Sequence, residues 1–243
     1  MRRLRPDPAD LDDAGLVDAY RLPEGRHLRV NFIASLDGAV TVDGKSEGLG
    51  SPGDRRIFQV LRALADVVLV GHGTASTEGY RPMTADSPVG RLRAAFGRQP
   101  TAPIAVVSNR ASLEPTSGLV TGAVSPTVLV TCAASDEGRQ AALEAAGVVV
   151  LVCGDDEVDL PLALDRLAAL GHEQVLCEGG PTLFRDALAA GVVDELDLSI
   201  APALVGQQHR LVDGLPDAVR LDLRQVLEED GVLFTRYRLP GAR

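Results

Sequence analysis

Residues 175–184, with the sequence VLCEGGPTLF, indicate a strand, a tight turn and the start of a helix. The apolar run before Glu178 is typical of a buried strand, Pro181 suits a first helical turn, and Gly191 would end the helix. Adjacent glycines let a ligand approach the backbone closely, and the first helical turn carries N–H groups without intrahelical partners. The segment therefore predicts a phosphate-binding turn. A strand–helix connection whose glycines only serve packing is the alternative.

Size and composition indicate one α/β domain. The chain has 243 residues, 45% of them hydrophobic, and no break in composition separates two domains. We predict an N-terminal arm over residues 1–26, which packs on the domain or on a second subunit, and a single domain over residues 27–243. Within the arm, the apolar spacing predicts a short helix at about residues 8–20.

The charge of the chain argues against nucleic acid as a partner. A formal net charge of −10 disfavours binding to a phosphate backbone, and an aromatic content of 3% leaves few side chains for stacking bases. The basic start of the chain is not followed by an apolar run. We therefore expect neither a signal peptide nor a membrane span, and a cytoplasmic location.

Apolar runs alternate with helical patterns through the middle of the chain. This alternation predicts a mostly parallel central sheet flanked by helices, closed by a C-terminal antiparallel hairpin. The segment at about 78–101 is expected to be a long polar loop, with a partly helical spacer as the alternative. Strands are expected at about 28–35, 67–70, 104–107, 127–130, 148–152, 175–177, 195–201, 219–227 and 231–239. Further helices are expected at about 52–64, 135–146, 160–170 and from 181 onward.

Three turns follow predicted strands, at residues 71–74, 108–110 and 178–182. Ligands of open α/β sheets bind at the carboxyl ends of the strands, so these turns should meet around one ligand. The combination suggests a dinucleotide, with its pyrophosphate on the two glycine turns and a 2′-phosphate against Ser108 and Arg110. For Arg110 taken alone, a solvated surface charge is the alternative.

Two acids are candidates for proton transfer. Glu178 stands at the mouth of the same crevice, where burial would favour its protonated form and let it donate a hydrogen bond or a proton. Asp54 follows Ser51 and Pro52 in a sequence typical of a helix start, so a capping role explains it equally well.

Other motifs give little support to metal or Rossmann chemistry. Residues 48–53 match G-x-G-x-x-G, but no apolar strand precedes them, so a flexible glycine-rich loop is the preferred interpretation. The four histidines are scattered, so no metal site is predicted. They are His27, His72, His172 and His209. The three cysteines, Cys132, Cys153 and Cys177, lack paired spacing and are expected to be reduced core residues.

The chain resembles the pyrimidine reductases of riboflavin biosynthesis, which have the dihydrofolate reductase-like fold. The resemblance covers about residues 28–239 in the order of the family. It is carried by SLDG at 35–38, SP at 51–52, RR at 55–56, LRA at 61–63, VGHGT at 70–74, EGGPTL at 178–183, DEL at 194–196 and AP at 201–202.

The resemblance implies an NADPH-dependent reductase that is usually a homodimer. The cofactor contacts of the family fall on Ala34, Thr74, Glu78, the loop after residues 104–107 and the segment from Gly180 onward. Together with the three predicted turns, they give the full set of expected cofactor residues. They are Ala34, Gly71, Thr74, Glu78, Ser108, Arg110, Gly179, Gly180, Pro181, Thr182 and Leu183. The implied substrate contacts are Ser46, Arg62 and Glu178, and we add Asp54 as the other candidate acid.

The chain also departs from the riboflavin enzymes. Asn31 stands where they carry a lysine, Glu78-Gly79-Tyr80 replaces an Asp-Asp-Pro sequence, and the zinc deaminase signature Cys-x-x-Cys is absent. The chain is also similar to an actinobacterial branch of the family, which has an N-terminal arm and an aspartate at the position of Asp54. In that branch a secondary dihydrofolate reductase activity is plausible.

We therefore predict hydride transfer from NADPH to a small pyrimidine- or pteridine-like substrate, with Asp54 or Glu178 supporting proton delivery. Phe32 and Phe58 could flank a planar ring, although core packing is expected for at least one of them. The competing hypothesis is an NADPH-binding module without turnover. A Rossmann dehydrogenase that uses residues 48–53 is a weaker third possibility.

Overall fold

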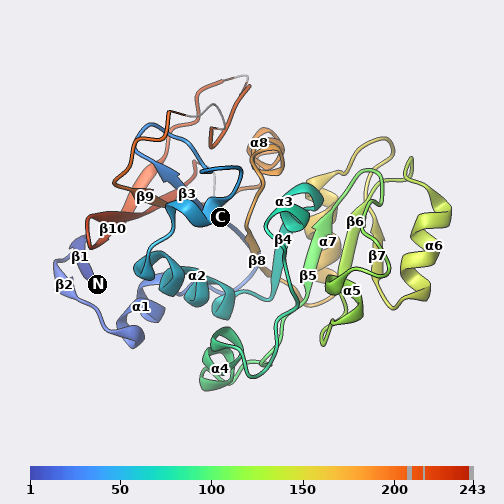
Figure 1. Ribbon diagram of the computed structural model, residues 1–243, viewed down its shortest axis with the longest axis horizontal. Helices are drawn as coiled ribbons and strands as arrows, with labels where there is room; N and C mark the ends of the chain where they lie inside the picture. Colours follow the sequence, from blue (N-terminus) through green and yellow to red (C-terminus); the bar gives the residue numbers. More distant parts are fainter. Residues whose placement is uncertain (207–209, 216, 241–243) are drawn as a thin grey trace.

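The fold is built on one eleven-stranded sheet, shown in Figure 1 in a computed structural model that describes residues 1–206, 210–215 and 217–240. Its strand order is β2-β1-β10-β11-β9-β3-β8-β4-β5-β6-β7. The strands are β1 (Arg2–Arg5), β2 (Ala9–Asp10), β3 (His27–Ser35), β4 (Val67–Gly71), β5 (Ile104–Val107), β6 (Val128–Thr131), β7 (Val149–Val152), β8 (Gln174–Cys177), β9 (Glu195–Ala201), β10 (Asp222–Glu229) and β11 (Val232–Arg238). The helices are α1 (Asp13–Tyr20), α2 (Pro52–Leu64), α3 (His72–Thr77), α4 (Pro88–Ala95), α5 (Gly118–Thr121), α6 (Glu137–Ala145), α7 (Leu160–Ala169) and α8 (Pro181–Ala189).

The predicted sheet is confirmed. Strands β9, β3, β8, β4, β5, β6 and β7 run parallel to one another, whereas β11 and β10 form an antiparallel hairpin that pairs with β9. The hairpin turns at Asp230, next to Gly231, and both residues have a positive φ. Each strand–helix unit of the parallel part therefore delivers its strand end to the same edge of the sheet.

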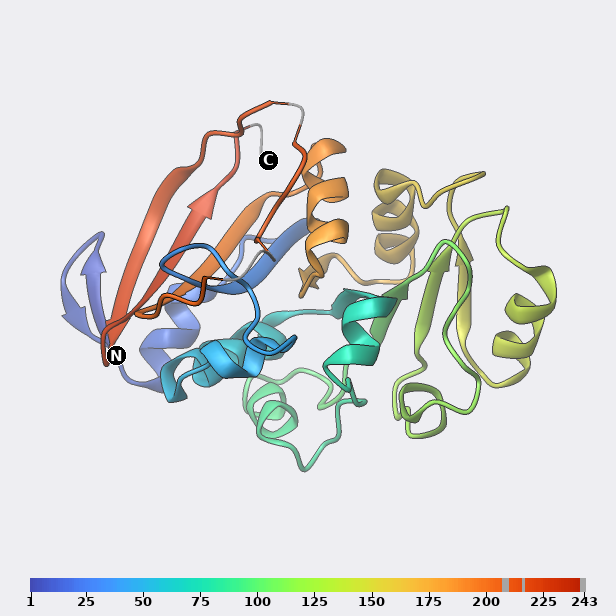
Figure 2. The ribbon, with the colours of Figure 1, turned by 45° about the horizontal axis from the view of Figure 1, so that its top comes forward.

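Side chains of the central strands alternate between two apolar layers. In β4, Val68 and Val70 pack into the layer with α1, α2 and α4, whereas Val67 and Leu69 pack into the layer with α7 and α8. Figure 2 shows α7 and α8 above the sheet and α2 and α4 below it. Because β4 is buried on both faces, it is apolar throughout, as parallel central strands usually are.

The N-terminal arm differs from its prediction. Its helix begins only at Asp13, since the Asp12 carboxylate caps it by accepting a hydrogen bond from the Gly15 N–H. The residues before it form β1 and β2, and β1 pairs with β10. The basic sequence of β1 carries no apolar alternation, so only the neighbouring strand explains why this segment is extended. The division at residue 26 stays a prediction.

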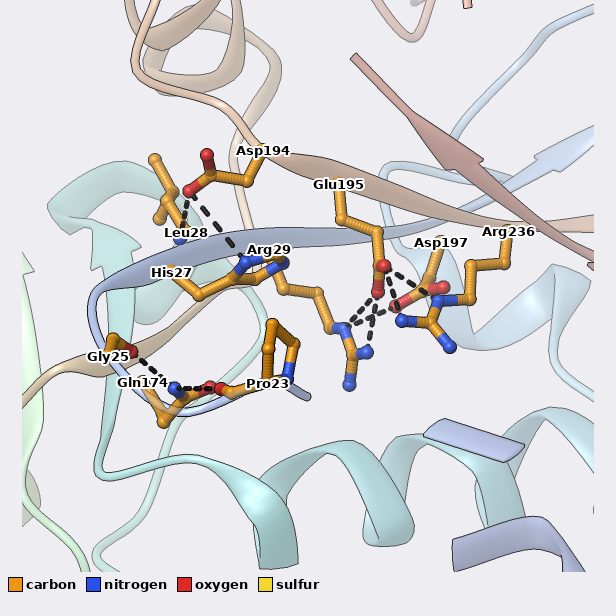
Figure 3. Close-up of polar contacts among 10 residues, drawn as sticks. All are labelled: Pro23, Gly25, His27, Leu28, Arg29, Gln174, Asp194, Glu195, Asp197 and Arg236. Carbon is orange, nitrogen blue, oxygen red and sulfur yellow. Dashed lines mark hydrogen bonds and ion pairs between the residues drawn. The ribbon is translucent and has the colours of Figure 1, made fainter. Parts of the chain in front are cut away.

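A buried cluster of charges holds the arm against the sheet (Figure 3). Arg29 and Arg236 each donate an Nε–H to one carboxylate oxygen of Glu195, both at 2.6 Å. Arg236 Nη1 also donates to the Ala19 carbonyl at 2.8 Å, and the Tyr20 ring centroid lies 5.7 Å from Arg29 Cζ. The last turn of α1 is thereby fixed to the sheet.

The segment at 78–101 contains helix α4, so the alternative of a partly helical spacer is the correct one. Ser87 caps this helix at Gly90 N. Arg93, only 4% exposed, places its guanidinium at the C-terminal end of α2, where it donates to the carbonyls of Arg62, Ala63 and Ala65. Arg93 therefore supplies hydrogen bonds to carbonyl groups at the end of α2 that lack intrahelical partners.

Residues 48–53 do not form a Rossmann turn. A short 3₁₀ helix covers Ser46–Leu49, and α2 begins at Pro52 without a preceding strand. A Cβ atom at Gly48 would lie 2.7 Å from Val42 Cβ, so this glycine is needed for packing. The three cysteines are buried and free, as expected.

Candidate active site

The three predicted turns lie side by side, because β8, β4 and β5 are neighbours in the sheet. The Gly71 N–H donates to the Gly179 carbonyl at 2.7 Å, and the Glu178 N–H donates to the Leu69 carbonyl at 2.9 Å. The turns after β4 and β8 are therefore joined directly by backbone hydrogen bonds. The prediction that they meet at one edge is correct.

The turn into α8 is open toward solvent-side cavities. Gly180 is the N-cap residue, Pro181 occupies the first turn, and no side chain caps the helix. The N–H groups of the first turn and the positive end of the helix dipole are thus available to an anion.

Both glycines of this turn are required by their neighbours. Gly179 has a φ of 82°, and a Cβ atom there would lie 2.6 Å from Phe32 Cζ. A Cβ atom at Gly180 would collide with Thr74 Oγ1. The Gly179–Gly180 peptide bond is cis.

Three adjoining cavities follow this edge of the sheet, with volumes of about 320, 320 and 340 Å³; we name them A, B and C. A and B share Thr41, Thr74, Glu78, Gly180 and Pro181, and B and C share Gly71, Thr182 and Leu183. Cavity A extends between β3, α2 and the turn after β8 and is lined by Asn31, Phe32, Ile33, Val40, Ser46, Glu47, Gly50, Ser51, Asp54, Arg55, Phe58, Tyr80 and Glu178 in addition to the shared residues. Cavity C is lined by Val107, Ser108, Asn109, Arg110, Ser112, Glu157, Val158, Leu160 and Asp186 in addition to the shared residues.

Glu178 lies in cavity A as a hydrogen-bond acceptor. Arg62 donates to both of its oxygens, from Nε to Oε1 and from Nη2 to Oε2, each at 2.7 Å. The Tyr80 hydroxyl donates to Oε2 at 2.6 Å. Although burial lowers the pKa of Arg62, the Glu178 carboxylate outweighs it and raises that pKa. Glu178 thus accepts three hydrogen bonds from Arg62 and Tyr80, and its role as a proton donor stays a prediction.

The guanidinium of Arg62 is enclosed by aromatic rings. Its Cζ lies 4.3 Å from the ring centroid of Phe58 and 5.2 Å from that of Tyr80. Burial, and then the nearby Glu178 carboxylate, raises the pKa of the Tyr80 hydroxyl well above its ordinary value. Tyr80 therefore remains a neutral hydrogen-bond donor.

Asp54 lies at the start of α2 and in the wall of cavity A, and its role in proton transfer stays a prediction. Its backbone N–H donates to Ser51 Oγ at 3.0 Å, which confirms the helix cap, and the same residue lines cavity A. Burial raises the pKa of its carboxyl group, while a hydrogen bond from Ser199 opposes the shift. Burial therefore shifts Asp54 toward its protonated form.

The loop before α2 covers cavities A and B. The Ser46 N–H donates to Glu78 Oε1 at 2.9 Å. This contact joins a predicted substrate residue to a predicted cofactor residue and holds the loop over the boundary between the two cavities.

Most of the predicted site residues line the three cavities. Cavity A holds Ser46, Asp54 and Glu178; cavity B holds Gly71, Thr74, Glu78, Gly180, Pro181, Thr182 and Leu183; cavity C holds Ser108 and Arg110. Three predicted residues do not line the cavities. Arg62 contacts Glu178, and Gly179 contacts Gly71 and lies close to Phe32, whereas Ala34 is a buried residue of β3. Their roles stay predictions.

The sequence analysis did not assign roles to Tyr80, Arg55 and Ser199. Tyr80 and Arg55 line cavity A, and Ser199 contacts Asp54 from β9. The Phe58 ring lies in the cavity wall as hypothesised, whereas the Phe32 ring packs on Phe184 with centroids 5.3 Å apart and also reaches the cavity. Tyr80 could have been noticed as a departure from the family pattern, but its partner Glu178 is distant in sequence.

The described residues contain no group of three or more histidine, cysteine, aspartate or glutamate side chains able to hold a metal ion. His209 lies outside the described residues. Among the helices that the structure describes, none has the length and apolar character needed to cross a membrane.

Comparisons with known proteins identify relatives over most of the chain. The family described as RibD C-terminal domain matches residues 26–233. The 2,5-diamino-6-ribosylamino-4(3H)-pyrimidinone 5′-phosphate reductase of Methanothermobacter thermautotrophicus is 35% identical over 225 residues, which cover 88% of this chain and 99% of that protein. The enzyme of the same name from Archaeoglobus fulgidus is 28% identical, over 74% of this chain and 82% of that protein. A solved pyrimidine reductase-like protein from Corynebacterium diphtheriae superposes with a TM-score of 0.76 at 25% identity, over 88% of this chain and 92% of that chain.

Proposed function

Because the chain belongs to the RibD C-terminal domain family, an oxidoreductase family of riboflavin biosynthesis, we propose that it is an NADPH-dependent reductase of a phosphorylated aminopyrimidine. The reaction would be that of its named relatives, the reduction of 2,5-diamino-6-ribosylamino-4(3H)-pyrimidinone 5′-phosphate. The observation that carries the proposal is the continuous row of cavities A, B and C along one sheet edge. It offers room for a dinucleotide with a second ring beside it.

The residues of cavities B and C fit a dinucleotide phosphate. Gly180 leaves space in front of Thr74 that a Cβ atom would fill, and the uncapped start of α8 offers N–H groups to a pyrophosphate. Ser108 and Arg110 in cavity C would hold the 2′-phosphate, since a guanidinium binds phosphate oxygens with two parallel hydrogen bonds. The bound cofactor would supply the hydride.

Cavity A fits a planar, amino-substituted ring. Phe58 contributes an apolar wall. Among the described residues, Glu178 Oε1 accepts a hydrogen bond from Arg62 Nε alone, whereas a carboxylate oxygen can accept two. Oε1 can therefore accept a further hydrogen bond from a ring amino group. Arg62 and Tyr80 keep the carboxylate oriented for this contact.

Asp54 would hold the proton that the reduced substrate requires. Its raised pKa favours the protonated carboxyl, and Ser199 orients the group from β9. A general acid near the reacting atoms typically contributes a factor of about 10²–10⁴ to the rate.

The test is NADPH oxidation by the purified chain. We expect consumption of NADPH with the phosphorylated aminopyrimidine and formation of the ribitylamino product, followed by absorbance and mass spectrometry. Tight NADPH binding without oxidation across a panel of pyrimidines and pterins would instead favour the binding module without turnover.

A secondary dihydrofolate reductase activity is a second proposal, supported by the raised pKa of Asp54 beside the aromatic wall of Phe58. It predicts slow NADPH oxidation with dihydrofolate that Asp54→Asn abolishes. We also propose that residues 27–243 act as one reductase domain and residues 1–26 as an arm, that two copies pair, and that the enzyme works in the cytoplasm. Light scattering of the purified chain tests the pairing.

A further inference from the structure

The wall of cavity A carries an unequal distribution of charge. Its described lining includes four acidic side chains, from Glu47, Asp54, Glu78 and Glu178, and a single cationic side chain, Arg55. A phosphate dianion would be repelled by most of this wall. A phosphorylated substrate therefore needs a cation at one end of the cavity.

Arg62 is not free to supply that cation. Its Nε and Nη2 atoms donate to the Glu178 carboxylate, and the guanidinium lies between the Phe58 and Tyr80 rings. Its charge is compensated inside the protein, where only 14% of the side chain is exposed. Arg62 is thus a positioning residue for Glu178.

Arg55 differs from the arginines around it. Across the described part of the chain, its side chain makes no hydrogen bond or ion pair, and it is exposed at the first turn of α2. The next residue, Arg56, points elsewhere and binds Asp13 and Glu229. The guanidinium of Arg55 therefore keeps its hydrogen-bond donors available at the edge of cavity A, and its charge lowers the pKa of the nearby Asp54 carboxyl against the effect of burial.

We propose that Arg55 binds the phosphate of the substrate and thereby selects a phosphorylated pyrimidine, an inference that rests on the proposed function. Asp54 and Arg55 are consecutive residues, one half-buried and the other exposed. Their order places the ring inside, near Asp54 and Glu178, and the phosphate at the solvent end. A guanidinium suits this task because its planar fork matches two phosphate oxygens.

The experiment compares the phosphorylated aminopyrimidine with the same compound lacking its phosphate. For Arg55→Gln, we expect kcat/KM with the phosphorylated substrate to fall about ten- to hundredfold, mainly through KM. With the dephosphorylated compound we expect no more than about a twofold change. Arg55→Lys should retain most of the preference because it keeps the charge. Arg166→Gln, an exposed arginine on α7 that lines none of the three cavities, is the matched control.

Two results overturn the role of Arg55 while leaving the reductase function intact. One is a wild-type enzyme that turns over both compounds equally well, and the other is an Arg55→Gln variant that loses activity equally with both. If the wild-type chain turns over neither compound, the proposed reaction fails, and calorimetry with NADP⁺ present then tests Arg55. Tighter binding of the phosphorylated compound that Arg55→Gln abolishes supports the inference, and an equal affinity for both compounds contradicts it.

Discussion

Arg62 and Glu178 face each other with both pairs of atoms in register, at 2.7 Å from Nε to Oε1 and from Nη2 to Oε2. The glutamate side chain is 3% exposed, so this pair is nearly removed from water. Breaking such a pair leaves an uncompensated buried charge, which costs more free energy than an exposed pair would. The geometry therefore fixes the orientation of the Glu178 carboxyl group.

Tyr80→Phe tests the third contact of this carboxylate. The variant removes a 2.6 Å hydrogen bond to Glu178 Oε2, and we expect the free energy of unfolding to fall by about 1–3 kcal/mol, with a lower kcat. Urea unfolding and steady-state kinetics measure the two effects. Tyr237→Phe is the control, because the Tyr237 hydroxyl has no hydrogen-bond partner among the residues described. Equal stability losses in the two variants would contradict the prediction.

Asp54→Asn should separate activity from stability. We expect kcat to fall about 10²- to 10⁴-fold while NADPH binding is retained. Burial raises the pKa of Asp54 in the folded state. The stabilisation that follows is fully present below the pKa of the unfolded state and is lost as the pH rises through the pKa of the folded state. At neutral pH the variant should therefore be at least as stable as the wild type in urea. A variant that keeps wild-type kcat would exclude Asp54 as the acid.

Gly180→Ala should prevent cofactor binding. The new methyl group would collide with Thr74 Oγ1 and occupy the space between cavities A and B. We expect the Kd for NADPH to rise at least about tenfold, measured by fluorescence titration. Gly118→Ala is the matched control: its Cβ would meet no atom within 4 Å, and Gly118 lines none of the three cavities. If both alanine variants bind NADPH like the wild type, the space in front of Gly180 is not needed for cofactor binding.

Arg110→Gln should reduce the discrimination between NADPH and NADH. The side chain lines cavity C, where the 2′-phosphate is proposed to lie. We expect about tenfold weaker NADPH binding and little change for NADH, because only the first carries that phosphate. Kd values for both cofactors provide the measurement. A parallel loss for both would assign Arg110 to another part of the dinucleotide.

Asp197→Asn tests the buried charge cluster, to which Asp197 belongs through its ion pair with Arg29 Nε at 2.9 Å. Burial raises the pKa of Asp197 to about 7, against the opposing attraction of Arg29. The proton is thus bound more tightly in the folded state, so stability should fall between about pH 4 and pH 7, by up to about 1.4 kcal/mol per pH unit, and level off above about pH 7. Urea unfolding between about pH 4 and pH 8 should give a flatter curve for the variant. Parallel curves would show that Asp197 stays charged throughout.

Local patterns were sufficient for the parallel part of the fold. Buried strands such as β4 and β8 are apolar on both faces, and the helix starts carry capping residues such as Ser51. The strands β1 and β2 were missed because their extended form depends on pairing with β10, more than 200 positions away. Local sequence carries no signal for such a contact.

The site was predictable where a ligand must approach the backbone and less so where side chains meet. Gly180 and the turn into α8 could be identified from glycine, proline and helix-start patterns. The link from Tyr80 to Glu178 joins residues 98 positions apart, and no periodicity connects them. The contact between Arg62 and Glu178 was likewise not foreseen, because the two residues are 116 positions apart.

Arg93 of α4, which donates to carbonyl groups at the C-terminal end of α2, also affects the candidate active site. Three carbonyl groups, of Arg62, Ala63 and Ala65, depend on the one guanidinium of Arg93. Without Arg93, those oxygens would need another hydrogen-bond donor. If none replaced it, the last turn of α2 would fray, and this turn contains Arg62, which holds the Glu178 carboxyl group.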